Sequence, residues 1–371
     1  MAASRLVLVL VLGVGVFVAA GIGLVWLVRP FEPARVEIVQ EGLDHPWDIA
    51  FADDGRMLVT ERIGRVLVFA NGGPDAELLS TATVPDVRAE LEAGLMGIAI
   101  HGDAVFVCAS RDPGDAWRVQ LLRSTLAGDG SLAPFAVVPI GDITGAPRHQ
   151  GCAVEVDADD YLWLTVGDAN LPAGENRAQD PDRLNGKVLR LGLDGSVPSD
   201  NPFGSPVFSL GHRNPQGLAF AFDGTAWAVE HGTDENDEIN RLQAGGNYGY
   251  PCFTGADAPG PIPDGCGAAS EYLQPAWASG SPTLATSGAT FLTGAGWRDW
   301  EGHLVVSTLK EEDLRRFSVA TDGSVTLEVT LLDGRFGRLR ALVIGPDGAL
   351  YVSTSNGTDD RILRATRHDW R

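Results

Sequence analysis

Lysine is almost missing from this chain of 371 residues. Only Lys187 and Lys310 occur among its 28 basic residues, and the remainder are arginines. Acidic residues outnumber basic ones, so the formal net charge is -21. Because a protein that binds nucleic acid needs a basic surface for the phosphates, this balance excludes nucleic acid as a partner. A lysine that persists in such a chain is a stronger candidate for a binding site than an ordinary lysine.

Charged residues are also missing from a long stretch near the N-terminus. The run from Leu6 to Val28 holds none over 23 positions, between Arg5 and Arg29. At about 1.5 Å per residue, a helix of this length crosses a hydrocarbon core of about 30 Å. The apolar core of a cleaved signal peptide is shorter, about 7 to 15 residues. We therefore favour an uncleaved membrane anchor in residues 1–30, with cleavage after Ala20 as the alternative. Both place the rest of the chain outside the cytoplasm.

Cys-x-x-Cys pairs are absent, and the chain has four cysteines in all. Oxidising compartments favour disulfides, and without such a pair nothing indicates a thiolate metal site. Cys252 and Cys266 bracket a loop rich in proline and glycine, which favours a bond between them. Cys108 and Cys152 then either pair with each other or stay free, because sequence alone does not fix connectivity.

Glycine and proline, by contrast, are abundant, with 46 and 22 residues. They occur in the turns of a sequence pattern that is repeated six times: an apolar strand, a turn of the Asp-Gly type and a second apolar strand. Tight turns between strands need such residues. The second strands of these six hairpins are expected at residues 56–61, 104–109, 161–166, 225–230, 303–308 and 349–354.

Six repeats of this kind predict a closed ring. One hairpin with one or two further strands cannot bury both of its faces, whereas six in a circle can, and closed radial repetition is a β-propeller. We therefore predict an all-β fold, a six-bladed β-propeller over residues 36–366, preceded by the N-terminal transmembrane or signal helix. Cys108 and Cys152 fall in neighbouring blades, so a bond between them would cross a blade boundary.

One rim of the predicted propeller collects polar side chains. In an antiparallel hairpin, the start of the first strand and the end of the second lie at the same edge. The densest segment is residues 210–217, where a polar turn opens onto an apolar strand. The residues expected on this rim are Glu61, Arg62, Glu92, Arg148, His149, Asp168, Arg213, Asn214, Gln216, Glu230, His231, Lys310, Arg338 and Arg340. This concentration predicts a functional face.

Several motifs occur in the order typical of a known family. They are His149-Gln150 and the segments 161–168, 185–191, 194–202, 211–217, 230–232 and 237–240. With these motifs the chain resembles the soluble-type sugar dehydrogenases that use pyrroloquinoline quinone (PQQ), also called the glucose/sorbosone or aldose sugar dehydrogenase family. The resemblance covers roughly Val36 to Thr366. The six-bladed propeller of that family agrees with the repeat count.

The resemblance implies oxidation of a sugar at its anomeric carbon to a lactone, with hydride passing to the quinone. His149 stands where the family has its general base, and histidine suits proton transfer near neutral pH. Asp168 follows at the spacing of the family, and Arg213 is expected to polarise the reactive carbonyl. Glu92, His149 and Asp168 are the residues expected to contact the sugar.

The resemblance also implies a cofactor pocket. PQQ carries three carboxylates, so its pocket needs cations and hydrogen-bond donors, and arginine forks suit carboxylates. The expected PQQ contacts are Arg213, Asn214, Gln216, His231, Lys310, Arg338 and Arg340. Independently, Arg338 and Arg340 alternate on one strand and so are expected on one face.

Calcium is the second expected cofactor. In the family this ion holds the quinone through successive backbone carbonyls, which correspond here to those of Gly232 and Thr233. The acidic stretch 234–238, which includes Glu238, and the nearby Tyr248 are candidates for a further Ca²⁺ site with oxygen ligands. The same stretch reads equally well as a solvated acidic loop.

The chain departs from the family pattern beside His149. Cys152-Ala153 stands where similar proteins often have a Gly-Arg pair, and Arg148 stands where some have an acid. A neighbouring arginine disfavours the protonated imidazole. We therefore expect either a weaker base or an anionic substrate, such as a sugar acid or a phosphorylated sugar.

Two other functions are compatible with a propeller. The scaffold can serve as a non-enzymatic binding module outside the cytoplasm, since fold does not fix function. A lactonase with a central metal would need several carboxylates and amides on the axis rather than four cations. The cationic rim favours the dehydrogenase, tethered to the membrane and delivering electrons to an external quinone or cytochrome.

Overall fold

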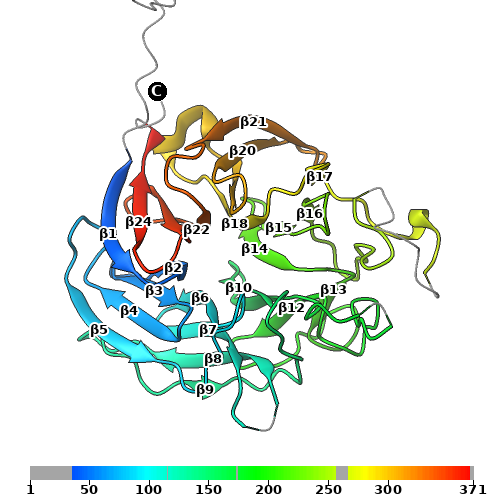
Figure 1. Cartoon of the computed structure of the whole chain (residues 1–371), viewed down its shortest axis with the longest axis horizontal. Helices are drawn as coiled ribbons and strands as arrows, with labels where there is room; N and C mark the ends of the chain where they lie inside the picture. The colour runs from blue at the N-terminus through cyan, green and yellow to red at the C-terminus, as the bar shows by residue number, and fades with distance from the viewer. Residues whose placement is uncertain (1–35, 115, 173, 256–265, 368–371) are drawn as a thin grey trace, which may run out of the picture.

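The computed structural model describes residues 36–114, 116–172, 174–255 and 266–367. Six four-stranded antiparallel sheets surround a common axis (Figure 1). The described residues contain no α-helix and two short 3-10 helices, η1 (Ala269–Glu271) and η2 (Ala295–Trp300). The all-β, six-bladed fold is therefore confirmed. The anchor expected in residues 1–30 lies outside the described part of the chain, within which no helix has the length and apolar character needed to cross a membrane.

Each blade is built from the axis outward (Figure 1). The innermost strands are β2 (Pro46–Phe51), β6 (Leu95–His101), β10 (Gly151–Val156), β14 (Pro215–Phe220), β18 (Thr286–Phe291) and β22 (Leu339–Ile344). The second strands are β3 (Met57–Glu61), β7 (Ala104–Arg111), β11 (Tyr161–Val166), β15 (Ala226–Glu230), β19 (Leu304–Thr308) and β23 (Leu350–Thr354). All six second strands begin within one residue of the predicted positions.

The outer two layers contain the remaining strands. The third strands are β4 (Arg65–Phe69), β8 (Arg118–Thr125), β12 (Lys187–Gly192), β16 (Glu238–Arg241), β20 (Leu314–Val319) and β24 (Asp360–Ala365). The outermost are β5 (Leu78–Thr83), β9 (Ala136–Val137), β13 (Val207–Leu210), β17 (Trp277–Ala278), β21 (Val325–Leu331) and β1 (Glu37–Leu43). The outermost strand of the sixth blade is thus the first strand of the chain, because β1 pairs antiparallel with β24 and closes the ring.

Every innermost strand has a β-bulge near its start. The register with the second strand shifts after Pro46, Leu95, Gly151, Pro215, Thr286 and Leu339. These residues pair at or near the ends of the second strands, so the starts and ends meet at one rim, as predicted. Because a bulge re-aims side chains, Trp47, Gln216, Ser287 and Arg340 come to line the central channel.

A repeated hydroxyl bond ties neighbouring blades together. In the first, third and fifth blades, a threonine or serine of the second strand accepts a hydrogen bond from its own inner strand. The same hydroxyl donates to a backbone carbonyl of the next inner strand: Thr60 to Met96 at 2.6 Å, Thr165 to Pro215 at 2.7 Å and Ser307 to Arg340 at 2.5 Å. These bonds fix the spacing of the strands that surround the channel.

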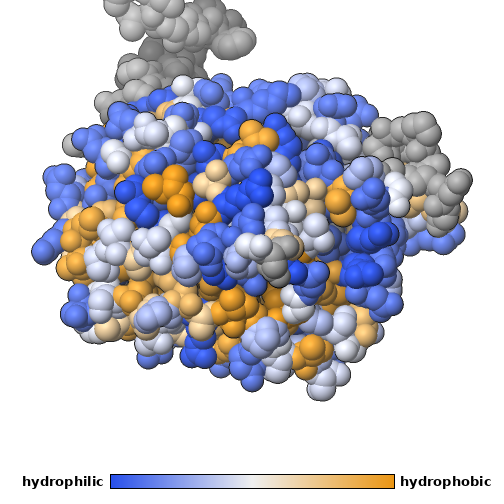
Figure 2. All heavy atoms as spheres, turned by 60° about the horizontal axis from the view of Figure 1, so that its bottom comes forward, coloured by the Kyte–Doolittle hydropathy of each residue, from blue (hydrophilic) through white to orange (hydrophobic). Residues whose placement is uncertain are grey.

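Two disulfides complete the fold. Cys252 bonds to Cys266, as predicted. Cys108 on β7 bonds to Cys152 on β10, so this bond crosses the boundary between the second and third blades. Both are the kind of bond that an oxidising compartment outside the cytoplasm preserves. On the face shown in Figure 2, apolar residues are scattered among hydrophilic ones.

Candidate active site

His149 and Asp168 form a buried pair on the rim. The imidazole Nδ1 lies 2.8 Å from Oδ1 of Asp168, and the carboxylate is fully buried. This contact assigns the ring proton to Nδ1 and leaves Nε2 as an acceptor. A carboxylate at Nδ1 also stabilises the positive charge that the ring gains when Nε2 takes a proton. The pair is therefore built to accept a proton at Nε2.

The segment between β11 and β12 holds Asp168 in place. The side-chain amide of Asn176 donates to Oδ2 of Asp168 at 2.9 Å, and the backbone N–H of Asn170 donates to Oδ1 at 2.8 Å. The far end of the segment is held by Lys187, which is fully buried. Its ammonium donates to the carbonyl oxygens of Arg177 at 2.8 Å and of Ala178 and Asn185 at 2.9 Å. Lys187 is thus structural, although burial lowers its pKa to about 7.

Glu92 connects the base to the neighbouring blade. Its Oε2 accepts the backbone N–H of His149 at 3.0 Å, and its Oε1 lies 3.2 Å from Nη1 of Arg148. Burial alone would raise the pKa of Glu92, but the hydrogen bond from the backbone of His149 and the neighbouring basic groups, which include Arg148, lower it. Glu92 is therefore ionised at neutral pH. The charge of Arg148, which we expected to weaken the base, is paired with this carboxylate.

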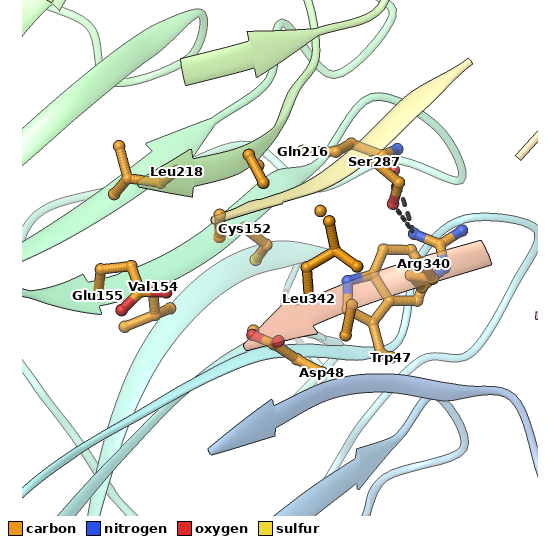
Figure 3. A pocket seen from close by; sticks show the side chains of 16 residues that line it. Trp47, Asp48, Cys152, Val154, Glu155, Gln216, Leu218, Ser287, Arg340 and Leu342 are labelled. Carbon is orange, nitrogen blue, oxygen red and sulfur yellow. Dashed lines mark hydrogen bonds between the residues drawn. The ribbon is translucent and has the colours of Figure 1, made fainter. Parts of the chain in front are cut away.

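Arg340 stands at the mouth of the central channel (Figure 3). Its guanidinium lies 3.7 Å from the ring centre of Trp47. Its Nη1 donates to Oε1 of Gln216 at 3.1 Å and to the hydroxyl of Ser287 at 3.4 Å. Burial lowers the pKa of Arg340 to about 9, with a further contribution from Arg338, so it stays charged at neutral pH.

Cations without acidic partners gather around this mouth. Among the described residues, no carboxylate forms an ion pair with Arg62, Arg213, Arg338, Arg340 or Lys310. Nε of Arg62, Nε of Arg213 and Nε2 of His231 are buried and have no hydrogen-bond partner. Buried donors are normally paired. A planar tricarboxylate such as PQQ offers the charge and the acceptors that these groups lack, so the residues present fit that cofactor.

Two predicted cofactor contacts lie at the outer edge of the site. Lys310 is exposed, with Nζ 3.5 Å from the hydroxyl of Thr283. Arg338 is also exposed and lies one residue before β22, and its Nη1 donates to the carbonyl oxygen of Leu309 at 3.3 Å. The charged ends of both side chains are therefore accessible to a ligand on the rim.

The polar segment 210–217 divides into a structural part and a part that faces the site. His212 is fully buried, with Nδ1 2.8 Å from Oε1 of Glu230 and Nε2 2.9 Å from the hydroxyl of Ser209. Arg213, Asn214 and Gln216 face the rim and the channel. Asn214 bridges two blades, because its Oδ1 accepts the N–H of Gly151 at 3.1 Å and its Nδ2 lies 3.5 Å from Glu92.

The residues proposed for calcium do not all converge. Among the described residues, the carbonyl oxygens of Gly232 and Thr233 accept no hydrogen bond, so they are available to a hard cation. Gly232 is fixed by its N–H, which donates to Asp237 at 2.8 Å. The free carbonyls fit the expected ion.

Glu238 is the first residue of β16, whereas Tyr248 lies beyond the strand and its hydroxyl contacts the other end of it. Glu238 is buried against Asn240 and the N–H of Gly255, and burial with the neighbouring Glu230 raises its pKa to about 8. The Tyr248 hydroxyl donates to the carbonyl of Arg241 at 2.6 Å. In the described part of the chain no cluster of three or more acidic, histidine or cysteine side chains could hold a metal. The second calcium site stays a prediction.

The channel is also lined by two carboxylates. Asp48 and Glu155 lie on the far side of Leu342 from Arg340 (Figure 3). Burial raises the pKa of Asp48 to about 7, and burial together with the nearby Asp48 raises the pKa of Glu155 to about 8. The cavity that these residues line together with Arg340 and Gln216 has a volume of about 30 Å³, which is room for one or two waters.

Sequence reasoning missed several residues of this site. Trp47 and Ser287 lie at bulge positions, which carry no local signal in an apolar strand. Arg62 was predicted to lie on the rim, but no contact with a cofactor or sugar was predicted for it. Asn176 lies in a polar segment whose contact with Asp168 depends on the course of the loop. The sequence predicted a polar rim as a whole, but it did not identify these individual residues as part of the site.

Comparison with known proteins gives a consistent result. The family model described as Glucose / Sorbosone dehydrogenase matches residues 43–364. Aldose sugar dehydrogenase YliI of Escherichia coli is 32% identical over 367 residues, covering 90% of this chain and 93% of that protein. The soluble aldose sugar dehydrogenase of Escherichia coli, solved in its apo-form, superimposes with a TM-score of 0.77 at 31% identity, covering 89% of this chain and 99% of that one. The PQQ-bound aldose sugar dehydrogenase of Streptomyces coelicolor gives 0.74 at 27% identity, covering 91% and 99%.

Proposed function

Because the chain belongs to the glucose/sorbosone dehydrogenase family, we propose that it oxidises an aldose-type sugar at its anomeric carbon to the lactone, with PQQ as the hydride acceptor. The observation that carries this proposal is the His149–Asp168 pair on the same rim as several cations that form no ion pair with a carboxylate among the described residues. A general base and an anion pocket on one rim are the two parts that this reaction needs.

His149 acts as the general base. Its Nε2 takes the proton of the anomeric hydroxyl, while Asp168 holds the ring through Nδ1 and stabilises the charged imidazole. Glu92 holds the backbone of His149 and remains ionised, so one of its oxygens can also accept a sugar hydroxyl. Arg213 would donate hydrogen bonds to the cofactor and would polarise its reactive carbonyl.

PQQ, when bound, supplies a quinone that accepts the hydride. Arg213, His231 and Arg340 would provide buried donors, with Asn214 and Gln216 between them. Lys310 and Arg338 would neutralise carboxylates at the outer edge. The free carbonyls of Gly232 and Thr233 would bind the Ca²⁺ that offsets the charge of the quinone.

The deciding experiment is reconstitution. The protein is loaded with PQQ in the presence of Ca²⁺, and oxidation of a panel of aldoses is followed by reduction of a dye. The panel includes aldonic-acid and phosphorylated sugars, because Arg148 lies beside the base. PQQ-dependent dye reduction with at least one aldose is the expected result. Stoichiometric PQQ binding without oxidation of any sugar would favour the second candidate, a non-enzymatic binding module.

We further propose that the propeller works outside the cytoplasm, held at the membrane by residues 1–30. The two disulfides support an oxidising compartment. In that setting electrons leave the reduced cofactor for an external quinone or cytochrome. The acceptor is tested by adding a cytochrome from the same membrane fraction and measuring sugar oxidation without a dye. Faster oxidation in its presence identifies it as the acceptor.

A further inference from the structure

The backbone around His149 has an unusual conformation. His149, Gly151 and Cys152 have φ angles of 56°, 65° and 75°. Such left-handed angles suit glycine, whereas a side chain disfavours them. Two of these three residues carry a side chain. The segment 149–152, here called the base arch, therefore needs contacts that hold it.

Cys152 is the bulge residue of the third blade. The corresponding residues of the other blades are Trp47, Met96, Gln216, Ser287 and Arg340. None of these five has a positive φ angle. The third blade thus combines the common bulge with a backbone conformation that the other blades avoid, at the place where the chain carries its base.

The base arch is packed tightly on both sides. A Cβ atom on Gly97 would lie 2.2 Å from the carbonyl oxygen of Cys152, and one on Gly151 would lie 2.8 Å from the nitrogen of Gly167. The N–H of Gly151 donates to Asn214 at 3.1 Å, and the carbonyl of His149 accepts the N–H of Ala169 at 3.1 Å. A rotation at Cys152 would therefore move the backbone of His149.

The disulfide is placed to prevent that rotation. Cys108 lies in the middle of β7, which is buried along its whole length. The Cα atoms of Cys108 and Cys152 are 5.6 Å apart, and both side chains are fully buried among apolar neighbours such as Met96 and Phe106. Turning Cys152 to an ordinary negative φ would swing its sulfur away from Cys108, and the bond forbids this.

We propose that the Cys108–Cys152 disulfide is a positioning element for the general base: it holds Cys152 in the left-handed conformation and thereby keeps the base arch, and the His149 imidazole, aimed at the sugar. The proposal rests on the proposed function in one respect, because it takes His149 as the base. Cys152 and Cys108 touch neither sugar nor cofactor in this role.

Two double variants separate the backbone effect from the loss of the bond. Cys108→Ala with Cys152→Ala removes the bond and leaves a side chain at a left-handed position. Cys108→Ala with Cys152→Gly removes the bond but places there the residue that adopts such angles freely. Both variants lose the same cross-link, so a difference between them reports the conformation at residue 152.

For the alanine variant we expect kcat to fall by about 10- to 100-fold, the effect of a misplaced catalytic group, with KM and PQQ affinity nearly unchanged. The glycine variant should recover most of this loss. In apo-protein, hydrogen exchange at the N–H of Gly151 should be faster in the alanine variant than in the glycine variant or the parent. Cys252→Ala with Cys266→Ala is the control, expected to leave exchange at Gly151 unchanged.

Wild-type kcat and slow exchange in the alanine variant would overturn the proposal. Equal losses of kcat in the alanine and glycine variants, with exchange at the N–H of Gly151 as slow as in the parent, would also overturn it, since the bond would then act only on global stability. Hydrogen exchange needs neither cofactor nor sugar. If the parent oxidises no sugar, the proposed function fails, while the exchange data still decide whether the disulfide holds the base arch.

Discussion

The guanidinium of Arg340 is stacked on the indole of Trp47, 3.7 Å from the ring centre. Both residues occupy bulge positions of neighbouring blades, the sixth and the first. The stack fixes the plane of the guanidinium, and Gln216 fixes one of its nitrogens. A buried cation held in this way, to which no carboxylate in the described part of the chain is bonded, can receive an anionic ligand in one orientation.

Arg340→Lys should therefore weaken PQQ binding by roughly tenfold or more. Lysine keeps the charge but loses the planar fork and the stack on Trp47, which together contribute about 1–2 kcal/mol. Titration of apo-protein with PQQ in the presence of Ca²⁺, followed by quinone absorbance, measures the effect. Arg88→Lys is the matched control, because Arg88 stacks on Trp117 at 3.8 Å without contact to the channel residues. Equal affinity in both variants would remove Arg340 from the cofactor pocket.

His149→Ala should lower kcat by about 10² to 10⁴, the usual contribution of a general base, while PQQ still binds. We expect kcat to fall without a loss of PQQ affinity, because His149 takes the proton of the sugar hydroxyl whereas the cations contact the cofactor. Steady-state kinetics with the best aldose and a PQQ titration test both parts. His101→Ala, at a partly exposed position outside the rim, is the control. Turnover at the parental rate in His149→Ala means that another group takes the proton.

The same substitution at the only two lysines should affect different properties, namely stability at Lys187 and PQQ affinity at Lys310. Lys187→Met leaves three buried carbonyl oxygens without their donor, so the free energy of unfolding should fall by about 1–3 kcal/mol. Lys310→Met removes an exposed rim cation, so stability should stay constant while PQQ affinity falls. Thermal unfolding of apo-protein and cofactor titration on both variants test this contrast. A stable Lys187→Met variant, or unchanged PQQ affinity in Lys310→Met, contradicts the corresponding assignment.

Stability should fall between about pH 4.5 and pH 8 because of Glu155. Burial and the neighbouring Asp48 raise its pKa from 4.5 to about 8 in the folded chain. In this window the unfolded chain releases the proton and the folded chain keeps it, so a rise in pH favours unfolding. Glu155→Gln removes the titration, and its gain in Tm over the parent should be larger at pH 8.5 than at pH 4.5. The exposed Glu77→Gln is the control, and a pH-independent difference in Tm would contradict the assignment.

The full-length protein should fractionate with membranes and need detergent for release. The uncharged run from Leu6 to Val28 is long enough to span, and Arg5 favours a cytoplasmic N-terminus. N-terminal sequencing of the mature protein tests the alternative. A mature chain that starts at Gly21 would show that the segment is a cleaved signal and not an anchor.

Much of this fold was predictable because its signals are local. Each Asp-Gly turn lies beside the strands that it joins, so the hairpins and the shared rim follow from sequence spacing. The pairing of β1 with β24 was not predictable in this way. It joins Glu37 to Arg364 across almost the whole chain, and the burial pattern of β1 resembles that of any outer strand.

The candidate site was predictable to a similar depth. His149, Asp168 and Arg340 stand out because they are ionisable residues at the rim ends of apolar inner and second strands. Trp47 did not, because an aromatic residue beside an apolar strand is ordinary in a core, and only the bulge turns it toward the channel. His212 shows a different case, since it lies in the polar segment 210–217 but Glu230 and Ser209 occupy both of its nitrogens.

The closure of the sixth blade by β1 has a consequence for biogenesis. A chain that emerges from a ribosome or a translocation pore delivers β1 first and β24 last. Until β24 arrives, β1 has no partner and the unfinished ring presents an open sheet edge, which is prone to pair with other chains. The first strand can therefore pair only after almost the entire chain has been made. Loss of the last strand during synthesis would leave five complete blades without a closed ring.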